Sequence, residues 1–68
     1  MNCQIEFKYD DGESQKINYN NVTSIICKPG ECDTQDVFIT CQVDDGREVK
    51  SFKTQRIYWV VNFQIIVK

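Results

Sequence analysis

The sequence predicts an all-β fold, a small and strongly bent five-stranded barrel of the SH3-like or Sm-like kind. Apolar and polar residues alternate with a period of two over most of the chain, which is the pattern of half-buried strands. The tripeptide Asp-Asp-Gly occurs at 10–12 and again at 44–46, and this composition favours a tight hairpin turn. No segment shows the apolar stripe of an amphipathic helix. An oligonucleotide/oligosaccharide-binding barrel is the alternative, although the sequence offers no helix for its usual mid-chain connection.

The first half of the chain predicts three strands. Apolar and polar residues alternate over 3–9, and the return strand after the first Asp-Asp-Gly turn ends at Tyr19. The asparagine pair that follows favours a turn. Residues 22–28 are rich in β-branched side chains, which suit a strand, and the next Pro-Gly pair opens an exposed loop at 29–35.

The second half continues with further segments of strand pattern. Residues 37–43 alternate again before the second Asp-Asp-Gly turn. A strand at about 47–53 follows, in which Val49 and Phe52 are three residues apart. A bulge between these two residues would let both side chains point inward.

The last strand, at 58–67, follows a predicted tight corner at 54–56. It is apolar on both of its alternating phases, which is typical of a strand that is covered on both sides. A barrel of this size has one interior, so the second phase or the free edge needs a second chain. We therefore expect a homodimer built on this strand.

One set of side chains in a common phase is expected to form the core, because alternation places them on one face of the sheet. Truncation of a large member, Phe52→Ala, is expected to cost about 3–5 kcal/mol and so unfold the domain. The residues expected to be mostly buried are Ile5, Phe7, Ile17, Val22, Ile25, Ile39, Cys41, Phe52 and Ile57.

The length of 68 residues predicts one domain, covering 1–68. Such a small core gives a margin of only about 3–5 kcal/mol without staples or partners. The first residues contain neither a basic start nor an apolar run, so we expect no signal peptide. The longest nearly uncharged stretch, 57–67, is too short to span a bilayer. We expect a cytoplasmic protein that does not bind membranes.

Charge is unevenly distributed along the chain. Three basic and nine acidic residues precede Gly46, whereas five basic residues and one acidic residue occupy the rest, within a net charge of −2. A local cationic strip on an acidic protein suggests a site for an anion. An ordinary solvated strand face is the alternative interpretation.

The candidate binding residues lie in and beside this strip. Arg47, Lys50, Lys53 and Arg56 are expected to contact phosphates, with Phe38 or Tyr58 as stacking platforms for a base. The expected ligand is a single-stranded nucleic acid or a nucleotide. Two alternatives stay open: Phe38 is buried at an edge, or Arg56 pairs with the acidic turn Asp10-Asp11.

Two segments resemble the WYL domain, an Sm-like barrel of bacterial and phage regulators. Residues 5–13 are similar to the opening strand and turn of that family, and residues 50–57 to its late motif of basic residues around a phenylalanine. The resemblance implies a regulatory or ligand-sensing module. The chain departs from the family at Val37-Phe38-Ile39, where the Trp-Tyr-Leu signature stands, and in having lysine at Lys50 and Lys53, where arginine is frequent. It also lacks the helix-turn-helix domain that usually accompanies the barrel.

We do not expect an enzyme. The sequence contains no histidine, so a general base near neutral pH would have to be a strongly shifted carboxylate, lysine or cysteine. The paired aspartates precede glycines in hairpin turns, where their role is turn geometry. No cofactor is implied.

The four cysteines predict structural roles. Cys3 and Cys41 occupy apolar positions of strands and are expected to be buried as small hydrophobic residues. Cys27 and Cys32 flank Lys-Pro-Gly-Glu, and they form the only pair with a spacing close to that of a zinc knuckle. We expect reduced thiols and no bound zinc. A four-thiolate zinc site and a Cys27–Cys32 disulfide are the alternatives.

Overall fold

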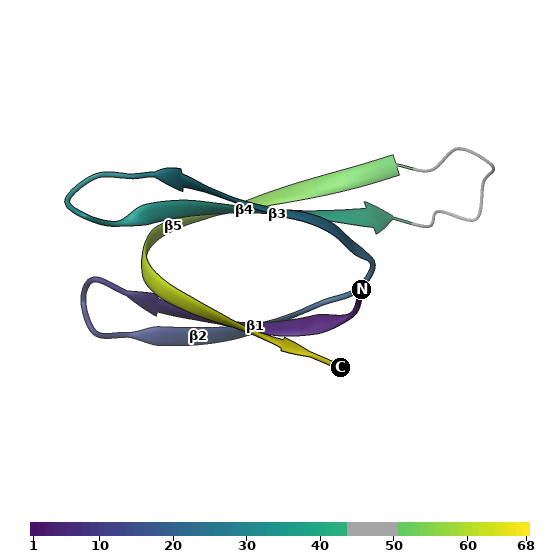
Figure 1. The fold of residues 1–68 in the computed structure, drawn as a ribbon, viewed down its shortest axis with the longest axis horizontal. Helices are drawn as coiled ribbons and strands as arrows, with labels where there is room; N and C mark the ends of the chain where they lie inside the picture. Colours follow the sequence, from purple (N-terminus) through teal and green to yellow (C-terminus); the bar gives the residue numbers. More distant parts are fainter. Residues whose placement is uncertain (44–50) are drawn as a thin grey trace.

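The computed structural model describes residues 1–43 and 51–68, and this part of the chain is all-β (Figure 1). The strands are β1 (Cys3–Tyr9), β2 (Ser14–Tyr19), β3 (Val22–Pro29), β4 (Gln35–Val43) and β5 (Ser51–Val67). They form one sheet in the order β2-β1-β5-β4-β3, in which every neighbouring pair is antiparallel. The predicted all-β, five-stranded fold class is confirmed.

The 17-residue strand β5 folds the sheet into two layers. Its first part pairs with β4 and its last part pairs with β1, so β3 and β4 lie in one layer and β1 and β2 in the other (Figure 1). Val60 is the pivot, because it pairs with Gln35 on one side and with Tyr9 on the other. Each strand therefore contributes one face to the space between the layers.

The segments predicted as separate strands at about 47–53 and 58–67 belong, where they are described, to the single strand β5. Its bend lies at Trp59, so the corner predicted at 54–56 is wrong. Residues 54–56 continue the regular ladder with β4, opposite 38–40. Trp59 instead has a left-handed backbone, with φ of 61°, and both ladders shift register beside it. A bulge of this kind lets a long strand change direction without ending.

A second bend connects β2 to β3 at the predicted asparagine turn. Asn21 has φ of 56°, a conformation that asparagine tolerates better than most residues. The amide of Val22 donates to the carbonyl of Met1 over 2.9 Å, so the N-terminus lies against this bend. Strands β2 and β3 are the two ends of the sheet, and in the described part of the chain strand pairing leaves the barrel open between them.

The first Asp-Asp-Gly turn forms the predicted hairpin. Gly12 has φ of 86°, and its amide donates to the carbonyl of Tyr9 over 3.1 Å. The Asp11 carboxylate accepts a hydrogen bond of 2.9 Å from the amide of Glu13, which is the turn role expected for this aspartate. The second Asp-Asp-Gly, at 44–46, lies outside the described residues.

The loop between β3 and β4 is closed by hydrogen bonds around Thr34. The amide of Gly30 donates to the carbonyl of Thr34 over 2.9 Å, and the amide and hydroxyl of Thr34 both donate to the carbonyl of Glu31. Cys32 and Asp33 adopt left-handed backbone conformations in this loop. Thr34 is the one buried polar residue of the part of the chain that the structure describes. The loop is therefore a defined turn that fixes the distance between two strand ends.

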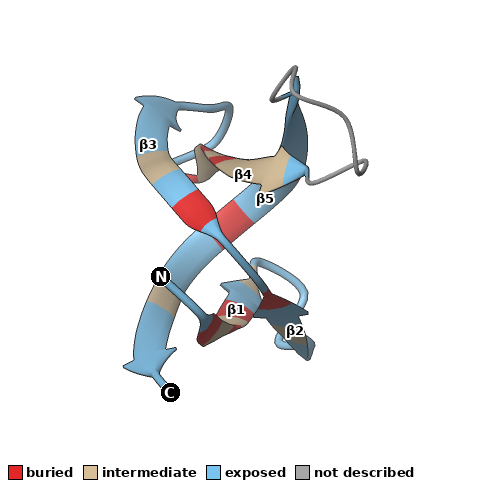
Figure 2. Ribbon diagram, turned by 90° about the vertical axis from the view of Figure 1, so that its right-hand side faces the viewer, coloured by how far each residue is buried: buried red, intermediate tan, exposed pale blue. Residues whose placement is uncertain are grey.

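The core fills the space between the two layers. Figure 2 shows buried residues on β1 and β4, whereas most of β5 is exposed. Ile5 and Phe7 are two residues apart in β1, so their side chains share one face of the strand. This face is turned toward the other layer, and both residues belong to the buried cluster. The buried apolar residues are Cys3, Ile5, Phe7, Tyr19, Val22, Val37, Ile39, Ile57 and Val60.

The predicted core is largely confirmed, with one error. Three expected members, Ile17, Ile25 and Cys41, are half-buried and pack against the buried cluster. Phe52 is 60% exposed, so its assignment to the core is wrong. It lies opposite Gln42 in the ladder and five residues before buried Ile57, which puts it on the outer face. The bulge inferred between Val49 and Phe52 includes residues outside the described part of the chain.

Candidate functional site

Lys53 and Arg56 lie on opposite faces of β5, so the expectation that they share one surface is wrong. Lys53 is opposite Cys41, on the face that looks into the space between the layers. Arg56 is opposite Phe38, whose neighbours in β4 are both buried, and therefore lies on the outer face. Arg47 and Lys50, the other two predicted phosphate ligands, lie outside the described residues.

The outer face carries a cluster of cations and aromatic rings, which we call the outer cluster: Lys28, Phe38, Arg56 and Tyr58. The guanidinium carbon of Arg56 lies 4.4 Å from the ring centroid of Tyr58 and 5.3 Å from that of Phe38. The ammonium of Lys28 lies 5.2 Å from the Phe38 centroid. Three predicted site residues, Phe38, Arg56 and Tyr58, therefore meet here. Lys28 joins them, although it was not among the predicted site residues.

The strand ladders explain this arrangement. Ile26, Phe38 and Arg56 form one row across β3, β4 and β5, and Lys28 and Tyr58 each lie two residues along from that row. Residues two apart in a strand share a face, so long side chains from neighbouring rows can reach the same ring. No pattern within a single strand predicts such a cluster.

Arg56 is held in place by Asp36. Its Nη2 donates a hydrogen bond of 2.7 Å to Oδ2 of Asp36. This hydrogen bond raises the pKa of Arg56 above its ordinary value, and desolvation opposes the rise. The alternative pairing with Asp10-Asp11 is wrong, because Asp36 is the partner. The guanidinium keeps further N–H groups, since it has five donors in a planar fork.

An open pocket of about 550 Å³ adjoins the outer cluster. Tyr58 and Trp59 form one part of its wall, and both rings are largely accessible. The bend of β5 places Trp59 here, although it belongs to the strand 58–67 that was predicted only to form a dimer. The lining residues are Pro29, Gly30, Glu31, Thr34, Asp36, Arg56, Tyr58 and Trp59.

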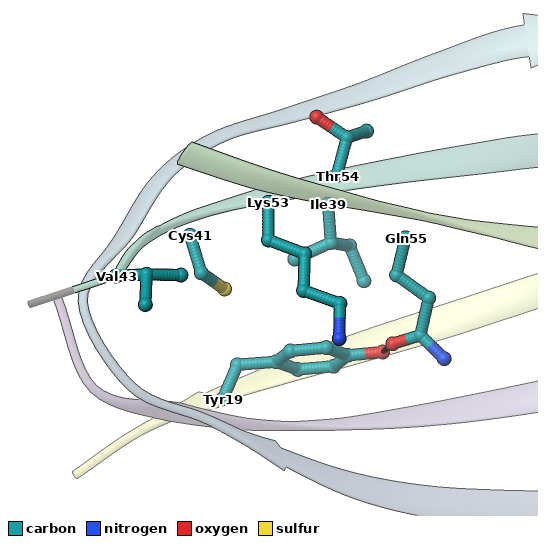
Figure 3. Close-up of a pocket in the computed structure, with 7 residues that line it drawn as sticks. All are labelled: Tyr19, Ile39, Cys41, Val43, Lys53, Thr54 and Gln55. Atoms are coloured by element: carbon teal, nitrogen blue, oxygen red, sulfur yellow. Dashed lines mark hydrogen bonds between the residues drawn. The ribbon is translucent and has the colours of Figure 1, made fainter. Parts of the chain in front are cut away.

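A second pocket, of about 350 Å³, opens between the two layers and is lined mostly by apolar surface (Figure 3). The hydroxyl of Tyr19 donates to Oε1 of Gln55 over 2.8 Å across this space. Burial, helped by nearby Cys41, Tyr9 and Cys3, raises the pKa of Tyr19 to about 12. The Tyr19 hydroxyl is therefore neutral and a reliable hydrogen-bond donor throughout the physiological pH range.

The cysteines are free thiols in two different settings. Cys3 is buried and Cys41 is half-buried, as expected for small core residues. Burial raises the pKa of the Cys41 thiol, and the neighbouring Cys3 adds to this rise. Cys27 and Cys32 are exposed. Among residues 1–43 and 51–68, no group of three or more His, Cys, Asp or Glu residues is placed to hold a metal ion.

The C-terminal part of β5 exposes apolar side chains along an edge of the sheet. Residues 62–67 pair with β1 on one side, and within the described residues no strand pairs with their other side. Val61 and Val67 are 54% and 66% exposed, and Ile65 and Ile66 are also exposed. The predicted excess of apolar residues on this strand is therefore present as accessible surface.

Neither the protein-family models nor the curated proteins nor the solved structures contain a match to this chain. The resemblance to the WYL domain thus stays a prediction from two short segments. In the described part of the chain, no helix is long and apolar enough to cross a membrane.

Proposed function

We propose that this protein is a non-enzymatic, ligand-sensing module that binds single-stranded nucleic acid through its outer cluster. The observation that carries the proposal is the guanidinium of Arg56 stacked between Phe38 and Tyr58, with Lys28 over the same phenylalanine ring. Cations beside accessible aromatic rings are the combination that single-strand-binding surfaces use, because phosphates and bases alternate along the ligand.

Phosphate contacts are assigned to Lys28 and Arg56. Asp36 orients the guanidinium through one N–H and leaves the others for a phosphate oxygen. The same carboxylate lowers the local positive charge, which suits a weak and salt-sensitive binder more than a tight one. The net charge of −2 agrees with a local site instead of general binding along a polyanion.

Base contacts are assigned to Tyr58 and Trp59. Phe38 is half-buried, so it supports Arg56 and offers a base less open surface than Tyr58, although Arg56 also lies over the Tyr58 ring. Tyr58 and Trp59 are accessible and line the open pocket of about 550 Å³ beside Arg56. A base stacked on one of these rings would place its phosphate near the guanidinium, at a stacking gain of about 1–3 kcal/mol.

The test is a fluorescence-anisotropy titration of a labelled oligothymidine at low and moderate salt. Arg56→Ala is expected to weaken binding most and to flatten the log–log salt dependence by about 0.7 units, which corresponds to one phosphate contact. Tyr58→Ala is expected to weaken binding with little change of slope. Lys8→Ala, which removes an exposed cation from β1 in the other layer, is the matched control. Absence of binding by the wild type at low salt, or an unchanged Arg56→Ala variant, would refute the proposal.

A protein-interaction role is the second candidate, and one observation favours it. The unpaired edge of β5 carries exposed Val61 and Val67 beside exposed Ile65 and Ile66. An apolar edge strand is a template for addition of another strand. A second copy of this chain is the proposed occupant, because two antiparallel copies of one edge are self-complementary.

A further inference from the structure

The pocket between the two layers has the chemistry of a small-ligand site that is separate from the outer cluster. It is bounded by β2, β4 and β5, and its lining is predominantly apolar. Figure 3 shows the side chains of Ile39, Cys41, Lys53 and Gln55 facing one space, with the Tyr19 ring as its floor, whereas the Thr54 side chain points away. The residues are Tyr19, Ile39, Cys41, Val43, Lys53, Thr54 and Gln55.

A single cation is placed at this apolar space. Among the described residues that line the pocket, Lys53 alone carries a charge. Its aliphatic chain extends from β5 across the pocket, and its ammonium points toward Tyr19 (Figure 3). The position follows from the ladder, which puts Lys53 opposite Cys41 on the inner face of the sheet. Lys53 is exposed, so its aliphatic chain lies along the apolar lining while its ammonium stays in water, where an anionic ligand can reach it.

Two polar side chains, those of Tyr19 and Gln55, also line the pocket beside Lys53. Tyr19 donates its hydroxyl proton to the amide oxygen of Gln55 over 2.8 Å. That bond fixes the orientation of the Gln55 amide, so its nitrogen faces the opposite way with two N–H donors. The amide nitrogen of Gln55 points away from Lys53, so the ammonium of Lys53 is the donor assigned to an oxyanion in this pocket.

We propose that this pocket binds a small monocarboxylate with an apolar body. The carboxylate pairs with the ammonium of Lys53, and the hydrocarbon part lies against Ile39, Cys41 and the Tyr19 ring. Burial of each methylene contributes about 0.8 kcal/mol, and a pocket of about 350 Å³ is at the small end of those that hold organic ligands. The apolar lining, in which Lys53 is the one cation among the described residues, favours a monocarboxylate over a nucleotide.

The site is independent of the proposed nucleic-acid surface. Lys53 and Arg56 are on opposite faces of β5, and the two pockets have no lining residue in common. Failure of one proposal therefore leaves the other standing, and each has its own cation to remove.

The experiment is a two-dimensional amide NMR titration with octanoate, with octanol as the uncharged analogue. Octanoate is expected to shift the signals of lining residues on β2, β4 and β5, and to bind at least about tenfold more tightly than octanol, since one charge-assisted contact is worth about that ratio. Lys53→Met keeps the apolar chain and removes the charge, so it is expected to abolish this preference and leave octanol binding unchanged.

Lys8→Met is the matched control, because Lys8 is an exposed strand lysine outside this pocket, and its variant should retain the preference for octanoate. The proposal is overturned if millimolar octanoate leaves the lining signals unshifted. It is also overturned if the Lys53→Met variant binds octanoate as the wild type does, or if the shifts map to the outer cluster.

Discussion

At the scale of single residues, one strand position decides whether a large aromatic residue is core or surface. Phe7 and Phe52 are the same residue type in strands of similar composition, yet Phe7 is fully buried and Phe52 is 60% exposed. Phe7 pairs with Phe63 on the inner face, and their ring centroids are 6.4 Å apart. The two phenylalanines differ in burial because their strand positions point to opposite faces of the sheet, and not because they differ in hydrophobicity.

This difference predicts contrasting effects of truncation. Phe7→Ala is expected to cost about 3–5 kcal/mol, because it leaves a cavity in a small core. Phe52→Ala is expected to change stability by no more than about 0.5 kcal/mol, since surface substitutions usually have little effect. Urea denaturation followed by Trp59 fluorescence measures both. A Phe52→Ala variant as unstable as Phe7→Ala would show that Phe52 is packed in solution.

At the scale of elements, β5 is the strand that sequence reasoning explains least. Alternation and turn composition predicted β1 to β4, the first hairpin and the asparagine bend, because those signals are local, but they divided β5 into two strands. The bend at Trp59 has no glycine or proline to mark it, and its cause is the need of one strand to pair with both β1 and β4. Phe38, Arg56 and Tyr58 were found for their residue types, but Lys28 and Asp36 were missed because they join the cluster only across strands.

The burial of the Tyr19 hydroxyl predicts a measurable pH dependence of stability. The pKa of Tyr19 is about 12 in the folded protein and 10.0 by its ordinary value, so folding favours the neutral phenol. This preference contributes on the order of 1–2 kcal/mol to the free energy of unfolding. The contribution is fully present below about pH 10 and is lost as the pH rises toward 12. Tyr19→Phe removes the bond to Gln55, at a cost of about 1 kcal/mol at neutral pH, and also removes this titration.

The stability difference between wild type and Tyr19→Phe is therefore expected to shrink between pH 10 and pH 12. Denaturant titrations at several pH values measure it, and the subtraction cancels the titration of the other tyrosines and lysines. A difference that stays constant over this range would contradict the assigned environment of Tyr19.

At the scale of the whole molecule, the described chain is thin. It measures 43 × 23 × 13 Å along its three principal axes, so the two layers have little depth between them for core side chains. A chain of this length buries less of its surface than a larger domain does, and apolar residues are left outside. The sequence predicted this excess from the two apolar phases of the last strand, but it did not predict which residues face outward, because the bulge at Trp59 shifts the phase.

The exposed edge of β5 predicts self-association through that edge. Two copies can add antiparallel strands at residues 61–67, which pairs the open backbone groups and covers Val61 and Val67. Sedimentation velocity is expected to show a dimer at micromolar concentration. The double variant Val61→Lys/Val67→Lys is expected to be a folded monomer, because charge on an edge strand opposes pairing.

Ile26→Lys is the matched control, because it removes an equally exposed apolar side chain from β3 and leaves the β5 edge intact. This variant should remain a dimer, since its site lies in the other layer on the outer face. A wild-type protein that sediments as a clean monomer at high micromolar concentration would rule out the dimer. Loss of the dimer in Ile26→Lys alone would instead move the interface to the outer face, where it would compete with the proposed nucleic-acid surface around Arg56.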